Sequence, residues 1–238
     1  MIRADFNQQL NEIADEIIRL GSMVDEAIAQ AMRALVERDS ALALRVIRND
    51  RHINELRYTL EEKSYRVLSI QQPVVARDLR RVVATIALSS NLERMADHAA
   101  GIAVLARRLN DEPELGPLAD FARMGEQVRA MLQKALRAFS DTDAALARSI
   151  VEDDRLVNQL HAQVLRDLLL LMVQETGTIR RATFLVWVAH NLERIGDRTK
   201  NLGERIVYVI TGELADFDVP RETSEELDEL DPLGDIPL

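Results

Sequence analysis

The chain has 238 residues, with 30 Lys and Arg against 40 Asp and Glu, which gives a formal net charge of −10. It contains no cysteine, so disulfide scaffolds, thiolate metal sites and cysteine nucleophiles are excluded. Nine glycines, six prolines and 4% aromatic residues make a composition that favours helices over strands.

The first segment predicts a long helix that packs in a bundle. Its apolar residues recur at alternating steps of four and three, which places them on one stripe. They are Phe6, Leu10, Ile13, Ile17, Leu20, Val24, Ala27, Ala31 and Ala34. Asp39 offers an N-cap for a second helix, which "QQP" at 71–73 ends because the residue before a proline avoids helical dihedrals. A third helix is predicted from about Val75 to Leu109.

The stretch "NDEPELGP" at 110–117 is the clearest break in the chain, and three further helices are predicted after it. They run over about 118–139, 142–174 and 178–211, with "SDTD" and "ETGT" as turns. No uninterrupted apolar run reaches the ~18 residues that a membrane span needs. We therefore expect an all-α chain, with one three-helix bundle in residues 1–110 and another in 117–212.

The last segment, residues 213–238, holds most of the negative charge. It carries ten acidic residues and one Arg, so the first 212 residues are close to neutral. Acid, proline and low apolar content predict a disordered tail. A nearly neutral body shows no strongly basic face of the kind that grips nucleic acid, so we expect no nucleic-acid partner.

The two halves repeat one another in sequence. Residues 39–56 match residues 143–160 at eight of eighteen positions, and "NLERMAD" at 91–97 matches "NLERIGD" at 191–197 at five of seven. The offset falls from 104 to 100 because the turn before the third helix is four residues shorter in the second half. We interpret this as a tandem duplication of a three-helix unit.

Oxygen-bearing side chains recur in both repeats at helical spacing. Glu193, Asp197 and Asn201 follow one another at four-residue steps, and Glu93 and Asp97 are their counterparts in the first half. The second helix of each unit adds an Asp/Asn pair, which is Asp50 and Asn54 or Asp154 and Asn158. Four oxygen donors from two helices would suit Mg²⁺, Mn²⁺ or Ca²⁺, and iron where carboxylates dominate.

The simpler interpretation of these side chains is a solvated helix face, because most exposed helix faces are charged. Against it, like charges at i, i+4 repel unless a cation or an Arg offsets them, and the pattern occurs twice. His161 lies on the same flank as Asn158, so it is either a nitrogen ligand of the second half only or a packed or exposed histidine.

Other chemistry has little support. Carboxylate di-iron enzymes need Glu-x-x-His pairs, and none of the four histidines follows a Glu by three residues. No Gly-rich phosphate loop or dinucleotide fingerprint occurs. The basic pairs Arg80-Arg81 and Arg180-Arg181 open the third and sixth helices; they are solvated, pair with Asp78 or Glu175, or dock an acidic partner.

The duplicated unit, the "D-R-x-x-N" of the second helix, the "QQPVVARDLR" turn and the "NLERxxD" of the third helix together resemble the PhoU family of bacterial phosphate-uptake regulators. The resemblance covers about residues 1–212. It implies a cytoplasmic, all-helical adaptor that is not an enzyme. Members associate with the ATPase-driven phosphate ABC transporter and with the phosphate-sensing histidine kinase, and keep the phosphate-starvation response off.

The resemblance also implies metal sites on the bundle surface, carried by Glu93 and Asp97 in the first half and by Glu193 and Asp197 in the second. We expect a divalent or trivalent ion (Mg, Mn, Zn or Fe), a homodimer, and membrane contact only through the transporter partner. The family motif continues to an Asn, which Asn201 matches and Gly101 does not, so the first site is predicted to be weaker. The alternatives are a metal-dependent enzyme acting on a phosphorylated small molecule and a purely structural scaffold.

Overall fold

The computed structural model describes residues 2–70, 74–116 and 118–217, and these are helical almost throughout. The first half consists of α1 (Ile2–Val36), α2 (Ser40–Ile70) and α3 (Ala76–Asn110). The second consists of α4 (Ala119–Asp141), α5 (Ala144–Arg148), α6 (Ile150–Gln174), the 3₁₀ turn η1 (Thr176–Thr178) and α7 (Ile179–Thr211). The prediction of an all-α fold of two tandem three-helix bundles is confirmed.

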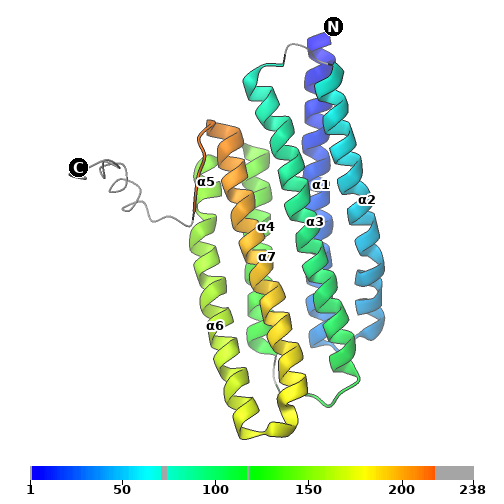
Figure 1. The fold of residues 1–238 in the computed structure, drawn as a ribbon, viewed down its shortest axis with the longest axis vertical. Helices are drawn as coiled ribbons and strands as arrows, with labels where there is room; N and C mark the ends of the chain where they lie inside the picture. The colour runs from blue at the N-terminus through cyan, green and yellow to red at the C-terminus, as the bar shows by residue number, and fades with distance from the viewer. Residues whose placement is uncertain (1, 71–73, 117, 218–238) are drawn as a thin grey trace, which may run out of the picture.

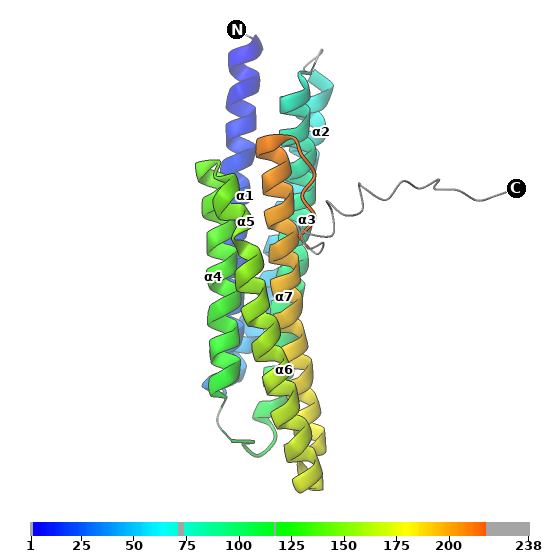
Figure 2. The ribbon, with the colours of Figure 1, turned by 90° about the vertical axis from the view of Figure 1, so that its left-hand side faces the viewer.

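The two bundles lie side by side (Figure 1). They meet through α3 packed on α7 and α1 packed on α4, whereas α2 contacts only α1 and α3, and α6 contacts only elements of the second half. α3 and α7 run in opposite directions, and the first bundle extends beyond the second at the end that carries the N-terminus (Figures 1 and 2). The α2–α3 and α6–α7 seams therefore lie on opposite flanks.

One continuous hydrophobic core runs through both bundles. The stripe predicted for α1 is buried, apart from Ala27, which is partly buried. Between the bundles the helices approach closely at glycines: a Cβ on Gly125 of α4 would lie 2.8 Å from Met32 Cγ of α1. Arg129 of α4 also holds Asp25 of α1 through two hydrogen bonds of 2.9 Å. None of the described helices combines the length and apolar character that crossing a membrane requires.

The single helix predicted for Thr142–Gln174 was wrong at its start. Thr142 has a left-handed backbone with φ 57°, and Asp143 is the N-cap of α5, because its Oδ1 accepts a hydrogen bond of 2.9 Å from Leu146 N. At Ser149 a turn separates α5 from α6, and the Ser149 hydroxyl donates to Leu146 O at 2.8 Å. A serine that bonds its own helix backbone competes with the regular ladder.

The acidic tail was predicted to begin at residue 213; within residues 213–217, Ala215 and Phe217 pack against the bundle, whereas the other three residues are exposed. Phe217 N donates to Glu204 Oε1 of α7 at 2.9 Å, and the Phe217 ring packs against the core near Gly203. The ring of an aromatic side chain removes a large apolar surface from water when it packs against a core. Residues 218–238, the rest of the predicted tail, lie outside the described residues.

Candidate functional site

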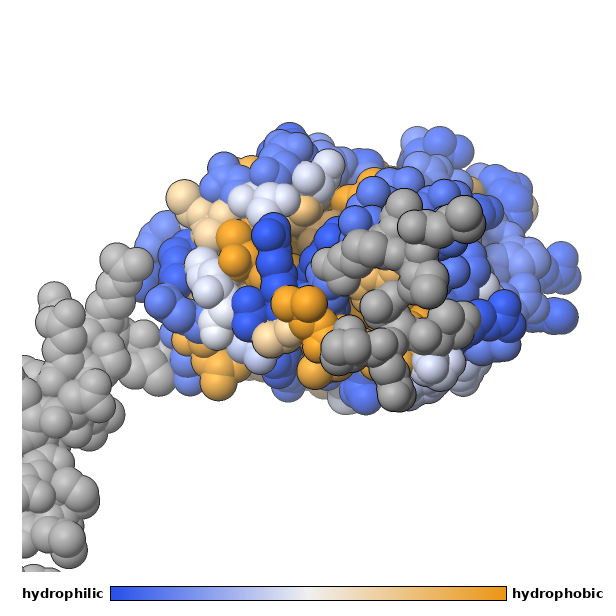
Figure 3. Space-filling model, turned by 90° about the horizontal axis from the view of Figure 1, so that it is seen from above, coloured by the Kyte–Doolittle hydropathy of each residue, from blue (hydrophilic) through white to orange (hydrophobic). Residues whose placement is uncertain are grey.

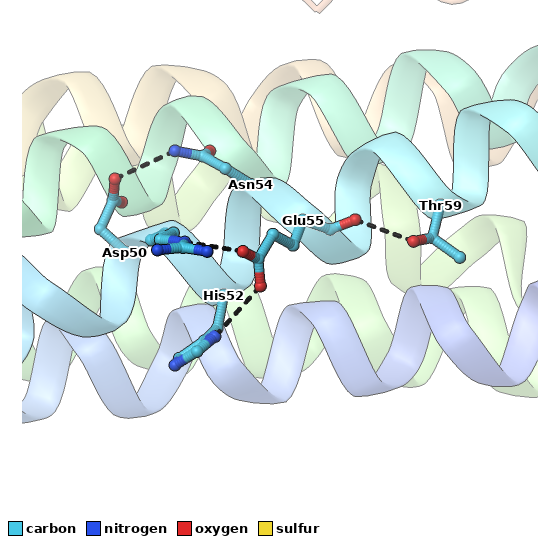
Figure 4. A network of polar contacts seen from close by, with 6 residues as sticks. Asp50, His52, Asn54, Glu55 and Thr59 are labelled. Carbon is cyan, nitrogen blue, oxygen red and sulfur yellow. Dashed lines mark hydrogen bonds and ion pairs between the residues drawn. The ribbon is translucent and has the colours of Figure 1, made fainter.

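In the first repeat, the predicted oxygen donors come together along the seam between α2 and α3. Asp50 and Asn54 stand one turn apart on α2, and Asn54 Nδ2 donates to Asp50 Oδ2 at 3.2 Å. In Figure 4 both side chains lie on the side of α2 that faces the ribbon of α3, whereas His52 points the other way. Glu93 and Asp97 of α3 are the opposing pair; we call these four residues the first carboxylate cluster.

Partial burial and, after it, repulsion within the first carboxylate cluster raise the pKa of Asp50 and of Glu93. Partial burial, followed by the negative charge of Asp97, raises the pKa of Asp50, and the hydrogen bond from Asn54 opposes this. Burial and then Asp97 also raise the pKa of Glu93, while Arg57 and Arg94 act in the opposite direction. Ionising both groups together is therefore disfavoured by burial and by their nearness to Asp97.

Two oxygen atoms of the first carboxylate cluster are buried and accept no hydrogen bond. They are Asp50 Oδ1 and Asn54 Oδ1, whose neighbours Asp50 Oδ2 and Asn54 Nδ2 are bonded to each other. A buried acceptor without a donor costs free energy, typically ~1–3 kcal/mol. These atoms fit a hard cation that takes oxygen ligands.

The second repeat reproduces the geometry along the seam between α6 and α7. Asn158 Nδ2 donates to Asp154 Oδ2 at 3.2 Å, as in the first repeat. Asp154 is buried and faces α7, since its Oδ1 lies 3.4 Å from where a Cβ on Gly196 would stand. Together with Glu193 and Asp197 of α7, these residues form the second carboxylate cluster.

The second carboxylate cluster differs from the first because basic side chains lie within it. Lys200 Nζ is 3.7 Å from Asp154 Oδ2, and both side chains are largely buried. Arg194 Nη1 is 3.3 Å from Asp197 Oδ2, and Arg194 Nε is 3.6 Å from Glu193 Oε2. Sequence reasoning missed Lys200, although its position three residues after Asp197 placed it on a neighbouring part of the helix surface.

Asn201 and Gly101 are the equivalent positions at which the two motifs differ, and their surroundings in the structure differ from those of the carboxylate clusters. Asn201 is partly buried and makes no side-chain hydrogen bond with any described residue. Gly101 lies at the contact between α3 and α7, where a Cβ would stand 3.1 Å from Asn191 Oδ1. Asn191 Oδ1 also lies 3.0 Å from His98 Nδ1, which links the bundles at the same level. Gly101 thus permits a close helix contact.

Within residues 2–70, 74–116 and 118–217, no three His, Asp or Glu side chains converge in the arrangement of a metal site. The donor set still fits an ion in the first repeat, where Asn54 supplies one oxygen and the carboxylates repel one another. It fits less well in the second, where Lys200 and Arg194 already supply positive charge. His161 is partly buried and lies on α6, three residues after Asn158.

Comparison with known proteins relates the chain to one family. The family model described as "PhoU domain" matches it twice, at residues 17–106 and 121–206, once in each repeat. A "Phosphate-specific transport system accessory protein PhoU homolog" of Clostridium acetobutylicum is 34% identical over 217 residues, which cover 91% of this chain and 99% of the relative. A protein of the same name from Pseudomonas putida is 34% identical over 212 residues, covering 89% of this chain and 82% of that one.

Solved structures agree with the sequence comparison. The crystal structure of PhoU from Pseudomonas aeruginosa superposes with a TM-score of 0.84 at 32% identity, covering 87% of this chain and all of that one. The phosphate transport system regulatory protein PhoU from Streptococcus pneumoniae superposes with a TM-score of 0.83 at 32% identity, covering 89% and 99%.

Proposed function

Since this chain belongs to the PhoU family, we propose that it is an accessory regulator of phosphate uptake that acts by binding other proteins. The observation that carries this proposal is the match of both repeats to the family model, over nearly the whole described body. Relatives named as accessory proteins of a phosphate-specific transport system support it. We infer a cytoplasmic location, where such a regulator would meet a transporter's ATPase subunit.

The proposed partners are the ATPase subunit of a phosphate ABC transporter and a phosphate-sensing histidine kinase. In this proposal the chain keeps the phosphate-starvation response off while phosphate is plentiful. Long helices whose outer faces stay exposed give such partners room to dock, and the α2 and α6 flanks are covered only by their own bundle. A homodimer is part of the same proposal.

We further propose that the first carboxylate cluster binds a divalent or trivalent metal ion. Asp50, Asn54, Glu93 and Asp97 would hold it, and the ion would offset the mutual repulsion of the three carboxylates. Both clusters contain buried oxygen atoms without a hydrogen bond, so the order of sites rests on the ion pairs that Lys200 and Arg194 make in the second cluster, and it reverses the ranking expected from Gly101. In the second cluster, Lys200 and Arg194 supply charge that an ion would have to displace.

Deleting the gene tests the regulatory role. Starvation-induced genes should then stay on in phosphate-rich medium, and a plasmid copy of the gene should switch them off again. Unchanged expression in the deletion strain would refute the proposed role. Co-purification from the native host, with the transporter ATPase and the sensor kinase tagged in turn, tests the two partners separately.

A turnover assay separates the adaptor from the enzyme alternative. We expect no metal-dependent hydrolysis of common phosphoesters by the purified protein. Hydrolysis that disappears in Glu93→Gln or Glu193→Gln would show that the carboxylate clusters are catalytic, and the adaptor proposal would fail.

A further inference from the structure

A hollow of about 530 Å³ lies where the first bundle extends beyond the second. The sides of α1 and α3 form one wall, and the last residues of α4 and α7 form the floor. Figure 3 looks down on this end of the molecule and shows hydrophilic and apolar residues side by side. The hollow is separate from both carboxylate clusters, and its size is that of a small-molecule site.

Two arginines of α3 line this hollow without a counter-ion. Arg77 and Arg81 stand one turn apart, and neither guanidinium makes an ion pair or hydrogen bond with another side chain in the part of the chain that the structure describes. Like charges at i, i+4 repel, with side chains only ~6 Å apart. Asp15 also lines the hollow, and the buried Asp78 lines the adjoining one together with both arginines.

The other repeat shows what such arginines bind. Arg181, the counterpart of Arg81, donates to the backbone oxygen atoms of Pro113 at 3.1 Å and Glu114 at 3.4 Å. Arg180 lies 3.4 Å from the carboxylate of Glu112, so the linker between the bundles supplies all these acceptors. Within the described residues, neither Asp78 nor Glu175 is the acceptor for Arg180 or Arg181. Of the first-repeat arginines, Arg80 is covered by Gly212 at the end of α7, which leaves Arg77 and Arg81 facing the hollow.

The remaining lining suits a ligand with an anionic end and an apolar end. The side chains of Asn11 and Ser140 can donate hydrogen bonds, while Phe139 and Ile210 offer apolar surface. Arginine binds phosphate oxygens with paired, planar donors, and two arginines one turn apart match the two negative charges of a phosphate monoester.

We propose that this hollow is a binding site for a small organic phosphate, with Arg77 and Arg81 as ligands of the phosphate group. The organic part lies against Phe139 and Ile210. The proposal is independent of metal binding and of the regulatory role, since none of these residues belongs to a carboxylate cluster.

Calorimetric titration of the full-length protein at low ionic strength tests the site, with AMP, inorganic phosphate and adenosine as probes. AMP should bind saturably, inorganic phosphate more weakly and adenosine not at all. Arg77→Gln and Arg81→Gln should each weaken AMP binding roughly tenfold or more, because a hydrogen bond to a charged group is lost. The matched control is Arg180→Gln, which removes a guanidinium from the other repeat and should bind AMP like the wild type.

The sequence also carries an acidic C-terminal segment, so the same titration is run on a full-length variant with Glu225→Gln, Glu226→Gln, Asp228→Asn and Glu229→Gln, which tests whether its negative charge affects AMP binding. Binding of AMP that is equal or tighter in this variant supports the site. Three results would overturn it: no saturable binding of AMP in either protein, adenosine binding as tightly as AMP, or wild-type affinity in both arginine variants.

Discussion

Asp50 and Asp154 occupy equivalent positions in the two repeats, and each accepts a hydrogen bond from an Asn one turn later. Their surroundings differ in charge. Asp154 has Lys200 beside it, whereas the residue equivalent to Lys200 in the first repeat is Ala100, which carries no charge. Arg94 and Arg194 occupy equivalent positions in the two repeats, so the largely buried ammonium group of Lys200 is what the second cluster has in addition.

Neutralising Glu93 tests the repulsion in the first carboxylate cluster. The pKa of Glu93 is raised in the folded state above its usual value of 4.5, so the stability that its protonated form contributes is complete below that pH and is lost as the pH rises through the folded pKa. Glu93→Gln should therefore raise the free energy of unfolding at pH 7 by about 0.5 kcal/mol, and the gain should vanish near pH 4. Urea titrations in chelator at both pH values measure it.

Glu55 provides the matched control. Hydrogen bonds from Arg51 and then His52 lower the pKa of Glu55, which is exposed and whose carboxylate points toward His52, away from Asp50 and Asn54 (Figure 4). Glu55→Gln should give no gain at pH 7. Equal gains from both substitutions would mean that overall negative charge, and not the cluster, is responsible.

Metal binding provides a second test of the first carboxylate cluster. Mn²⁺ should raise the melting temperature of the wild type, and more so at pH 7 than at pH 5, because the ion needs ionised carboxylates. In Asp50→Asn most of this increase should disappear. An undiminished increase in Asp50→Asn, measured by scanning calorimetry, would rule out the first cluster as the metal site.

Replacing Lys200 in the second carboxylate cluster should make the stability of the protein depend on a metal ion there. Lys200→Met leaves the buried Asp154 without its ion pair and should cost on the order of 1–3 kcal/mol of stability in chelator. Mn²⁺ should restore part of this loss. Lys134→Met, which breaks the ion pair with Asp153, is the control, and its loss should not respond to Mn²⁺. If Mn²⁺ restores the stability of both variants equally, a metal ion does not take the place of the Lys200 ammonium group.

At the scale of elements, the break between α5 and α6 allows the start of the second repeat's long helix to pack on α7. Gly203 of α7 lies at this contact, where a Cβ would stand 2.9 Å from Phe217 Cε2 and 3.1 Å from the Ala147 oxygen. A backbone oxygen cannot move aside as a flexible side chain can. The same glycine thus accommodates α5 and the segment that follows α7.

Gly203→Ala should consequently destabilise the protein by about 1–3 kcal/mol, since overpacking forces backbone shifts. The matched control is Gly177→Ala in η1, where no atom lies within 4 Å of the added Cβ. That substitution should leave stability unchanged or raise it by about 0.5 kcal/mol. Denaturant titrations compare the two, and similar values for both would contradict the packing argument.

At the scale of the whole molecule, the two bundles share one core and are offset along their length, so each leaves a step at one end (Figure 2). The linker after α3 fills one step through Arg180 and Arg181. The step at the other end is the hollow lined by Arg77 and Arg81. The two repeats thus share the same arrangement of helices, but the linker covers the arginines of only one of them.

The shared core predicts that the two bundles unfold together. Trp187 is the chain's one tryptophan and lies on α7 beside the groove shared with α3, so its fluorescence reports the junction, while far-UV circular dichroism reports every helix. The two signals should give the same midpoint in guanidinium. A fluorescence transition at lower denaturant would show that the bundles separate before they unfold.

Much of this organisation was predictable from the chain alone. The apolar stripe of α1 follows from local spacing, because burying one face of a helix requires apolar residues at every third or fourth position. The pairing of Asp50 and Asn54 with the third-helix carboxylates was predictable for the same reason. The break at 110–117 and the duplication are also visible in the sequence. Local spacing did not reveal the turn at Ser149, which lies near the contact of α5 with Gly203 of α7.

The sequence by itself therefore determined the helices, their repetition and which oxygen-bearing side chains share a seam. Only the tertiary structure decided that Lys200 lies against Asp154, that Gly101 serves a contact between bundles, and that Arg77 and Arg81 face a hollow while Arg181 is bonded to the linker. The physical reason is that spacing along a helix determines the side of the helix from which a side chain projects. Whether its charge is compensated depends on distances to other helices, which are remote in sequence.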